Sequence, residues 1–252
     1  LGLGGPVFAL IEQGNFGWSS PVIYLPFALG IASFAAFLFW QARATSPMLP
    51  LSLFRIRNFS AGNVATAFVY AALSLGGFIV VVFLQQVAGL PATIAALAFL
   101  PVSIANVVLS RFFGGLSGRY GPRLFMTLGP VLAGLGYLLF LRVGAEVNYW
   151  FDVLPAVVVF AIGLSMTVAP LTSAILGSVP AAQSGIGSAA NNAVARVAGL
   201  IAIALVGVIV AGTLDVPSFH RVIIVTATLF FAGAAASFVG IRNPRPQGET
   251  PS

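Results

Sequence analysis

The sequence contains no cysteine and only one histidine, which excludes disulfide bonds and thiolate metal centres. Charge is also scarce, because charged residues make up 6% of the chain whereas ordinary soluble domains have roughly a quarter. Hydrophobic residues make up 59%. So few charges cannot cover the surface of a water-soluble fold, and the composition therefore predicts a protein that lies in a lipid bilayer.

Long apolar runs separated by short polar segments predict spanning helices, each of about 20 residues. Residues 1–11 are expected to end one span, and 12–21 to form a turn. Complete spans are expected at 22–41, 59–84, 92–112, 124–143, 153–174, 193–213 and 219–241. The other expected segments are a polar cytoplasmic linker at 42–58, a small-residue loop at 175–190 and a disordered cytoplasmic tail at 242–252. The fold class is an all-α polytopic membrane protein.

The arginines are unevenly distributed when the loops and span ends are assigned to alternate sides. One side contains Arg43, Arg55, Arg57, Arg111, Arg119, Arg123, Arg196, Arg242 and Arg245, and the other only Arg142 and Arg221 together with Glu12, Glu146, Asp152 and Asp215. Because basic loops stay in the cytoplasm, the first side and the C-terminus are expected there. The net charge of +6 then reflects membrane topology and not nucleic-acid binding.

Residues 114–123, GGLSGRYGPR, are expected to form a short cytoplasmic turn between two spans. Glycine permits close helix approach, and arginines can hold neighbouring helix ends or lipid phosphates. The candidate gating residues of this turn are Gly114, Leu116, Arg119, Gly121 and Arg123. The segment resembles the loop signature of the major facilitator superfamily, except that Gly118 stands where the family pattern has aspartate. A basic surface loop without a gating role is the alternative.

Further segments extend this resemblance over nearly the whole chain: PMLPLSLFRIRNF at 47–59, FLQQVAG at 83–89, TVAPLT at 167–172 and GSAANNAVAR at 187–196. Together they are similar to the fourteen-helix drug:proton antiporter branch (EmrB/QacA type). The resemblance implies that 1–41 is the end of one helix and the second helix of a central hairpin, and that 59–241 is the C-terminal six-helix bundle. The chain does not begin with Met, and it is expected to be the C-terminal portion of a longer protein.

The same resemblance implies proton-driven efflux of a hydrophobic small molecule by alternating access, with no cofactor besides the proton gradient. The implied partners are the lipid bilayer and an N-terminal six-helix bundle, which in the family carries the proton-coupling acid. The implied location is the bacterial inner membrane. A truncated, transport-incompetent fragment or membrane interaction partner is the alternative, and a membrane-embedded enzyme is disfavoured because the spans offer no histidine or acid.

Substrates of such transporters bind near the bilayer midplane, so polar and aromatic residues deep in the spans are candidate contacts. These are Asn63, Tyr70, Phe78, Asn106 and Met166. For the two asparagines an interhelical hydrogen bond is the alternative role, and for the two apolar residues and Tyr70 it is packing.

Asn192 and Arg196 are expected to begin a helix at the cytoplasmic side, where Arg196 would serve as a gate residue whose guanidinium reaches the headgroups. His220 at the outer surface could serve as a proton relay, although a surface role is favoured. Gly129, Pro130, Pro170, Gly199 and Gly207 are expected either to bend helices or to allow their close packing.

Overall fold

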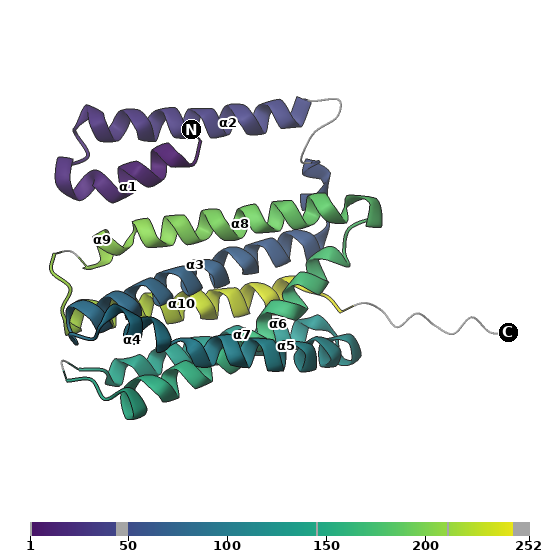
Figure 1. Cartoon of the computed structure of the whole chain (residues 1–252). Coiled ribbons are helices and arrows are strands. Elements are labelled where there is room, and N and C mark those ends of the chain that lie inside the picture. Colours follow the sequence, from purple (N-terminus) through teal and green to yellow (C-terminus); the bar gives the residue numbers. More distant parts are fainter. Residues whose placement is uncertain (1, 44–49, 145, 211, 244–252) are drawn as a thin grey trace.

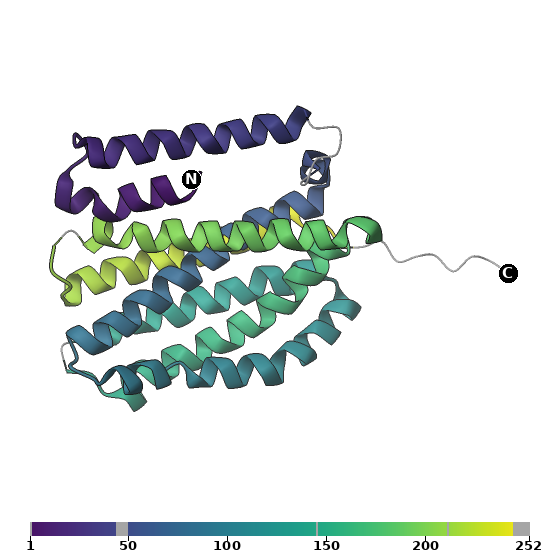
Figure 2. The same cartoon turned by 45° about the horizontal axis from the view of Figure 1, so that its top comes forward.

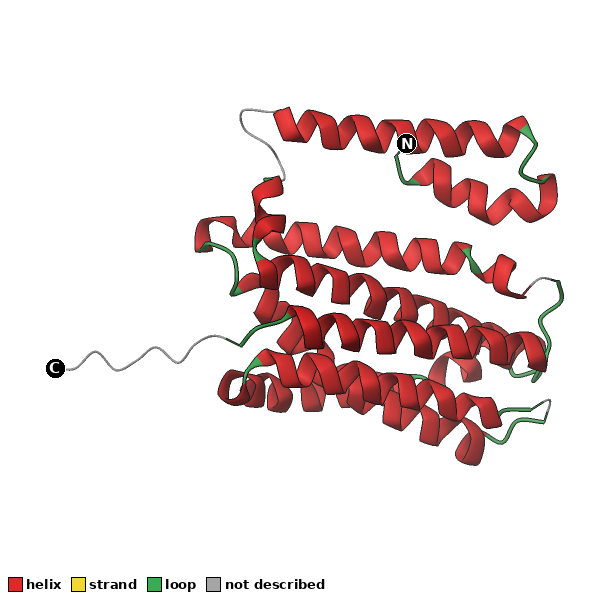
Figure 3. Ribbon diagram, turned by 180° about the vertical axis from the view of Figure 1, so that it is seen from behind, coloured by secondary structure: helices red, strands yellow, loops and turns green. Residues whose placement is uncertain are grey.

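A computed structural model describes residues 2–43, 50–144, 146–210 and 212–243, and this part of the chain is helical throughout apart from turns and short connections (Figure 1, Figure 3). Residues 44–49 of the predicted linker and 244–252 of the predicted tail lie outside the described ranges. The α-helices are α1 Gly4–Phe16, α2 Pro21–Arg43, α3 Arg57–Gln86, α4 Ala92–Leu97, α5 Leu100–Tyr120, α6 Pro122–Leu139, α7 Leu154–Leu176, α8 Ser184–Ala204, α9 Val206–Val210 and α10 Val216–Gly240.

Short 3₁₀-helices η1 Leu51–Arg55, η2 Phe140–Arg142 and η4 Ala181–Gln183 and a π-helical turn η3 Tyr149–Val153 connect them. In the described residues, seven segments are long and apolar enough to cross a membrane, with 30 residues in Arg57–Gln86 and 21 in Pro21–Gln41. This confirms the all-α polytopic fold and the seven complete spans expected from the sequence.

Three predicted boundaries were wrong, each because a helix continues through residues expected to form a turn. Helix α1 runs to Phe16, so the turn that follows begins only at Gly17. Helix α5 runs to Tyr120, and helix α8 begins at Ser184 and not near 193. Each glycine inside a helix costs only about 1 kcal/mol relative to alanine, so the glycines in these stretches do not end the helices.

The tightest packing in the bundle is between α6 and α7, where glycines let the two backbones meet. A Cβ added to Gly163 on α7 would lie 2.4 Å from the Ala133 nitrogen, and one added to Gly136 on α6 would lie 2.5 Å from the Phe160 nitrogen. A Cβ added to Gly129 on α6 would likewise lie 2.8 Å from the Gly163 carbonyl oxygen. Of the two roles expected for Gly129, bending its helix or allowing close packing, the structure shows close packing at this interface.

Helix α3 lies against α10, α8 and α7. One face of α3 joins a buried aromatic cluster, in which Tyr137 of α6 stacks on Phe230 of α10 at a ring distance of 5.5 Å and meets Phe160 edge-on at 4.9 Å. Tyr137 is fully buried against Gly76 of α3. This cluster holds α3, α6, α7 and α10 together as one core.

Helices α1 and α2 form a hairpin beside the bundle (Figure 1, Figure 2). Helix α1 packs against α2 and also contacts α8 and α9. Helix α8 therefore lies between the hairpin and α3, with residues of α3 on one side and α1 on another.

Candidate functional site

A cavity of about 420 Å³ opens along the contact between α3 and α8. Its wall from α3 includes Tyr70 and Ser74, and its wall from α8 includes Asn192 and Arg196 with the apolar Ala195, Gly199, Leu200 and Ile203. The structure thus brings together a predicted substrate contact, Tyr70, and two predicted gating residues. We refer to this space as the α3–α8 cavity.

Arg196 lies much deeper than expected. Helix α8 begins at Ser184, and Arg196 follows about 18 Å along the helix axis, in a bilayer whose hydrocarbon core is about 30 Å thick. Tyr70 lies about 20 Å along α3 from Arg57, which is a similar distance from the start of its helix. The prediction that Asn192 and Arg196 begin the helix at the cytoplasmic surface was therefore wrong, because the small-residue stretch 184–190 is helical.

A hydrogen-bond network joins α3 and α8 on the side of the cavity nearer the N-termini of both helices. The Asn191 side-chain nitrogen donates to the Asn63 side-chain oxygen at 3.2 Å and to the Thr66 hydroxyl oxygen at 2.7 Å. Asn63 is buried, and its own amide donates to the Phe59 carbonyl at 2.8 Å. This is the interhelical bond foreseen as the alternative role of Asn63, and substrate contact at Asn63 stays a prediction. Sequence reasoning missed Thr66, which only the register of the two helices reveals.

The remaining substrate candidates do not line the α3–α8 cavity. Asn106 is half-buried on α5, where its side-chain oxygen accepts a bond from the Ser110 hydroxyl at 2.5 Å. Met166 is half-buried on α7. Phe78 is 41% exposed and lines a second opening of about 450 Å³, further along α3, together with Gln86 and residues of the α9–α10 connection. These three residues stay predictions as substrate contacts.

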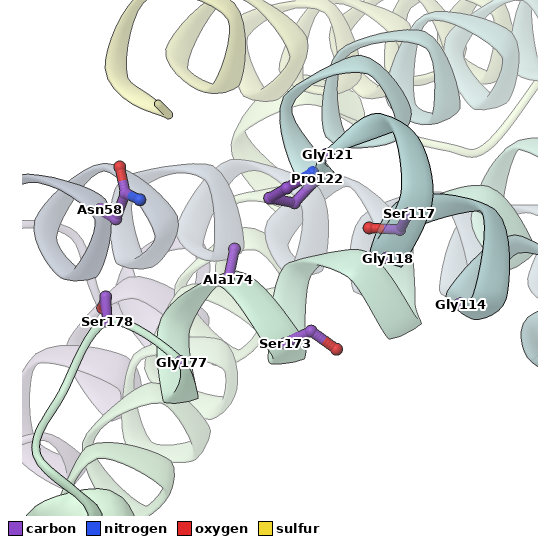
Figure 4. Close-up of a pocket in the computed structure, with 10 residues that line it drawn as sticks. All are labelled: Asn58, Gly114, Ser117, Gly118, Gly121, Pro122, Ser173, Ala174, Gly177 and Ser178. Atoms are coloured by element: carbon purple, nitrogen blue, oxygen red, sulfur yellow. The ribbon is translucent and has the colours of Figure 1, made fainter. Parts of the chain in front are cut away.

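The predicted cytoplasmic turn at 114–123 is mostly helical. Gly114, Leu116 and Arg119 lie in α5, and the chain reverses only at Gly121, whose positive φ of 87° suits glycine. Gly114 and Gly121 line a cavity of about 250 Å³ between helix ends, shown in Figure 4, with Asn58, Ser117, Gly118, Pro122, Ser173, Ala174, Gly177 and Ser178. A Cβ at Gly118 would meet nothing within 4 Å, so the position where the family pattern has aspartate opens into free space.

Arg123 holds the end of a neighbouring helix, as expected for this segment. Its Nε donates to the Phe238 carbonyl of α10 at 2.9 Å, and its guanidinium lies 4.6 Å from the centre of the Phe238 ring. Arg57 of α3 donates to the Gly240 carbonyl at 2.9 Å and the Val239 carbonyl at 2.7 Å. Both arginines thus satisfy carbonyl groups at the C-terminus of α10 and complement its helix dipole. Arg119, in contrast, is exposed and makes no hydrogen bond to any described residue.

The N-terminus of α10 is capped by an acidic residue, Asp215. The Asp215 carboxylate accepts a bond from the Ser218 backbone nitrogen at 2.8 Å, and the Asp215 nitrogen donates to the Ser218 hydroxyl at 2.9 Å. Hydrogen bonds from the hydroxyl and the backbone N–H of Ser218 lower the pKa of the Asp215 carboxyl. His220 contacts the Val143 carbonyl oxygen at 2.9 Å. Among the described residues no group of three histidines and acids could hold a metal ion.

Comparison of the sequence with known proteins identifies its family. A sequence model of the Major Facilitator Superfamily matches residues 1–203. The chain is 30% identical to the methylenomycin A resistance protein of Bacillus subtilis over 213 residues, which cover 83% of this chain and 45% of that protein. It is 28% identical to the multidrug resistance protein Stp of Mycobacterium tuberculosis (85% and 40% covered) and to the lincomycin resistance protein LmrB of Listeria monocytogenes (81% and 43%).

The chain spans about half the length of the curated relatives it matches, or somewhat less. The match supports the sequence-based expectation of a multi-pass membrane transporter and not an enzyme. It also confirms the resemblance to drug-resistance proteins. The chain therefore belongs to the major facilitator superfamily, as a relative of its drug- and antibiotic-resistance transporters.

Proposed function

We propose that the chain forms the C-terminal part of a proton-driven efflux transporter for hydrophobic small molecules, which works by alternating access. The observation that carries this proposal is the α3–α8 cavity, which brings together an aromatic ring, an amide and a guanidinium about halfway along two helices long enough to span a membrane. Binding sites of transporters lie near the bilayer midplane between two helix bundles. The relatives named for drug and antibiotic resistance support the same conclusion.

The chemistry of the cavity suits an amphipathic molecule. Leu200, Ile203 and the ring of Tyr70 offer apolar contact, while Asn192 and Ser74 offer hydrogen bonds. Small-molecule sites are commonly built from such an apolar wall with a few polar groups. Phe78 at the outer end of the same helix would extend the apolar path toward the exit.

The second half of the transporter, in this proposal, is an N-terminal six-helix bundle that faces the α3–α8 cavity. It supplies the acid that carries the coupled proton. Residues 1–41 would then belong to a central hairpin and 59–241 to the C-terminal bundle, with the C-terminus in the cytoplasm of a bacterial cell and the protein in its inner membrane. The arginines at the ends of α3 and α6, beside the C-terminus of α10, support that orientation.

The test is a transport assay with this chain produced together with an N-terminal six-helix bundle of a relative, in proteoliposomes with an imposed pH gradient. Ethidium efflux should depend on the gradient. Tyr70→Ala and Asn192→Ala should each lower the rate several-fold, whereas Tyr24→Ala, an exposed tyrosine on α2, should leave it unchanged. Efflux that is independent of the pH gradient would refute proton coupling. Unchanged efflux in the double variant of Tyr70 and Asn192 would refute the site.

A further inference from the structure

Arg196 carries a full charge at mid-membrane depth, where a charge is costly unless it is paired or faces a water-filled space. It is exposed to the α3–α8 cavity. Among the residues that the structure describes, no other charged side chain lines this cavity: its other polar groups are the neutral side chains of Tyr70, Ser74 and Asn192. All four side chains, including that of Arg196, can donate hydrogen bonds to an anion, and the guanidinium of Arg196 has no acceptor at all.

Three arginines nearer the ends of their helices have hydrogen-bond partners within the chain. Arg57 and Arg123 donate to carbonyl groups at the end of α10, and Arg221 donates to the Val210 carbonyl at 3.1 Å. Arg196 makes no hydrogen bond or ion pair with any described residue, although it is the deepest of the four. A guanidinium in this position therefore calls for an acidic partner from outside the bundle.

We propose that Arg196 forms a mid-membrane anion site that binds a carboxylate in the α3–α8 cavity, with Asn192 as an additional donor. The planar guanidinium matches a carboxylate through two parallel hydrogen bonds. Asn192 lies one helical turn before Arg196 on the same face of α8, so its amide can reach the same group. The proposal deepens the proposed function and rests on it. The carboxylate comes either from an acidic side chain of the facing bundle or from the transported molecule.

The absence of cysteine from the chain allows a direct measurement of the charge in the cavity. Asn192→Cys and Leu200→Cys place single thiols one turn before and one turn after Arg196, both exposed to the cavity. Thr213→Cys, in the exposed α9–α10 connection, is the matched control. Each is introduced in the chain paired with a cysteine-free N-terminal bundle, and the rates of modification by an anionic and a cationic methanethiosulfonate reagent are compared.

Replacing Arg196 by Gln should shift the anion-to-cation rate ratio at both cavity thiols toward the cationic reagent, by about tenfold. Arg196→Lys should retain most of the native ratio, and the ratio at Thr213→Cys should not move. An unchanged ratio at both cavity thiols in Arg196→Gln would overturn the anion site. Two reporter thiols are used so that misfolding of one variant does not decide the result.

The source of the carboxylate is found with benzoate as a probe. If the transported molecule supplies it, benzoate slows modification of Leu200→Cys in the native background and not in Arg196→Gln. If the facing bundle supplies it, benzoate has no effect, and Arg196→Glu regains ethidium efflux when one acidic residue of that bundle is changed to Lys. Failure of both results would overturn the proposal. The thiol measurement needs no transport, so absence of ethidium efflux by the native pair refutes the proposed function separately.

Discussion

Gly76 and Gly77 are neighbours on α3 with opposite surroundings, and they provide a matched test of how the core is packed. A Cβ on Gly76 would lie 2.3 Å from Cε1 and 2.4 Å from Cζ of Tyr137, whereas a Cβ on Gly77 would meet nothing within 4 Å. Ordinary contact begins at 3.4 Å, so Gly76→Ala requires a displacement of about 1.1 Å. Tyr137 is fully buried, and its ring packs against those of Phe160 and Phe230.

Gly76→Ala and Gly77→Ala gain the same helix propensity, up to about 1 kcal/mol, so the difference between them isolates the clash. Overpacking of this kind costs about 1–3 kcal/mol. For a chain of this size, a free-energy cost in that range makes the melting temperature of Gly76→Ala about 2–12 °C lower than that of Gly77→Ala. The measurement is thermal unfolding of the purified protein in detergent. Adding Tyr137→Leu, which removes the ring, should recover part of the loss. Equal melting temperatures of the two alanine variants would refute the packing argument.

Three further predictions concern single contacts. Tyr137→Phe removes a buried hydroxyl that has no partner among the described residues, and should leave the protein equally stable or more stable by about 1 kcal/mol in the same melting assay. Arg123→Ala removes a bond to a terminal carbonyl of α10 and should speed hydrogen exchange in its last turn several-fold, whereas Arg119→Ala should not; equal exchange in both would contradict this role. Asn63→Ala and Asn191→Ala should be coupled by roughly 0.6–1.7 kcal/mol in a double-mutant cycle of melting stability, and strict additivity would show that their bond is not formed.

The number of spans was predictable from the sequence because hydrocarbon thickness sets a minimum length for each apolar run. The ends of the helices were not predictable, because glycine and serine indicate a turn in a water-soluble protein but are common inside membrane-spanning helices. A Cβ on Gly114 would make only ordinary contact with Ala169, at 3.6 Å, and α5 continues through that position. The first real reversal is at Gly121, the position with positive φ.

The depth of Arg196 was mispredicted for the same reason, although one signal was available. Pro180 precedes a short 3₁₀ turn at Ala181–Gln183 and then α8, and proline is typical just before or at the start of a helix. A start near Pro180 would have placed Arg196 in the middle of its span. The pairing of Asn191 with Asn63 and Thr66 depends on the rotation of α8 against α3, which spacing within either helix does not determine.

The two faces of α3 make different contacts, and this bears on how the proposed transporter would move. Tyr70, Ser74 and Phe78 recur every four residues and line the openings beside α8 and α9. Gly76, on another face, is in direct contact with the aromatic core. The wall of the cavity is thus part of a helix fixed to α6, α7 and α10. A change in access at this cavity is therefore more easily made by moving the whole bundle against the proposed N-terminal bundle than by moving α3 alone, since the latter would break the contact between Gly76 and the buried Tyr137.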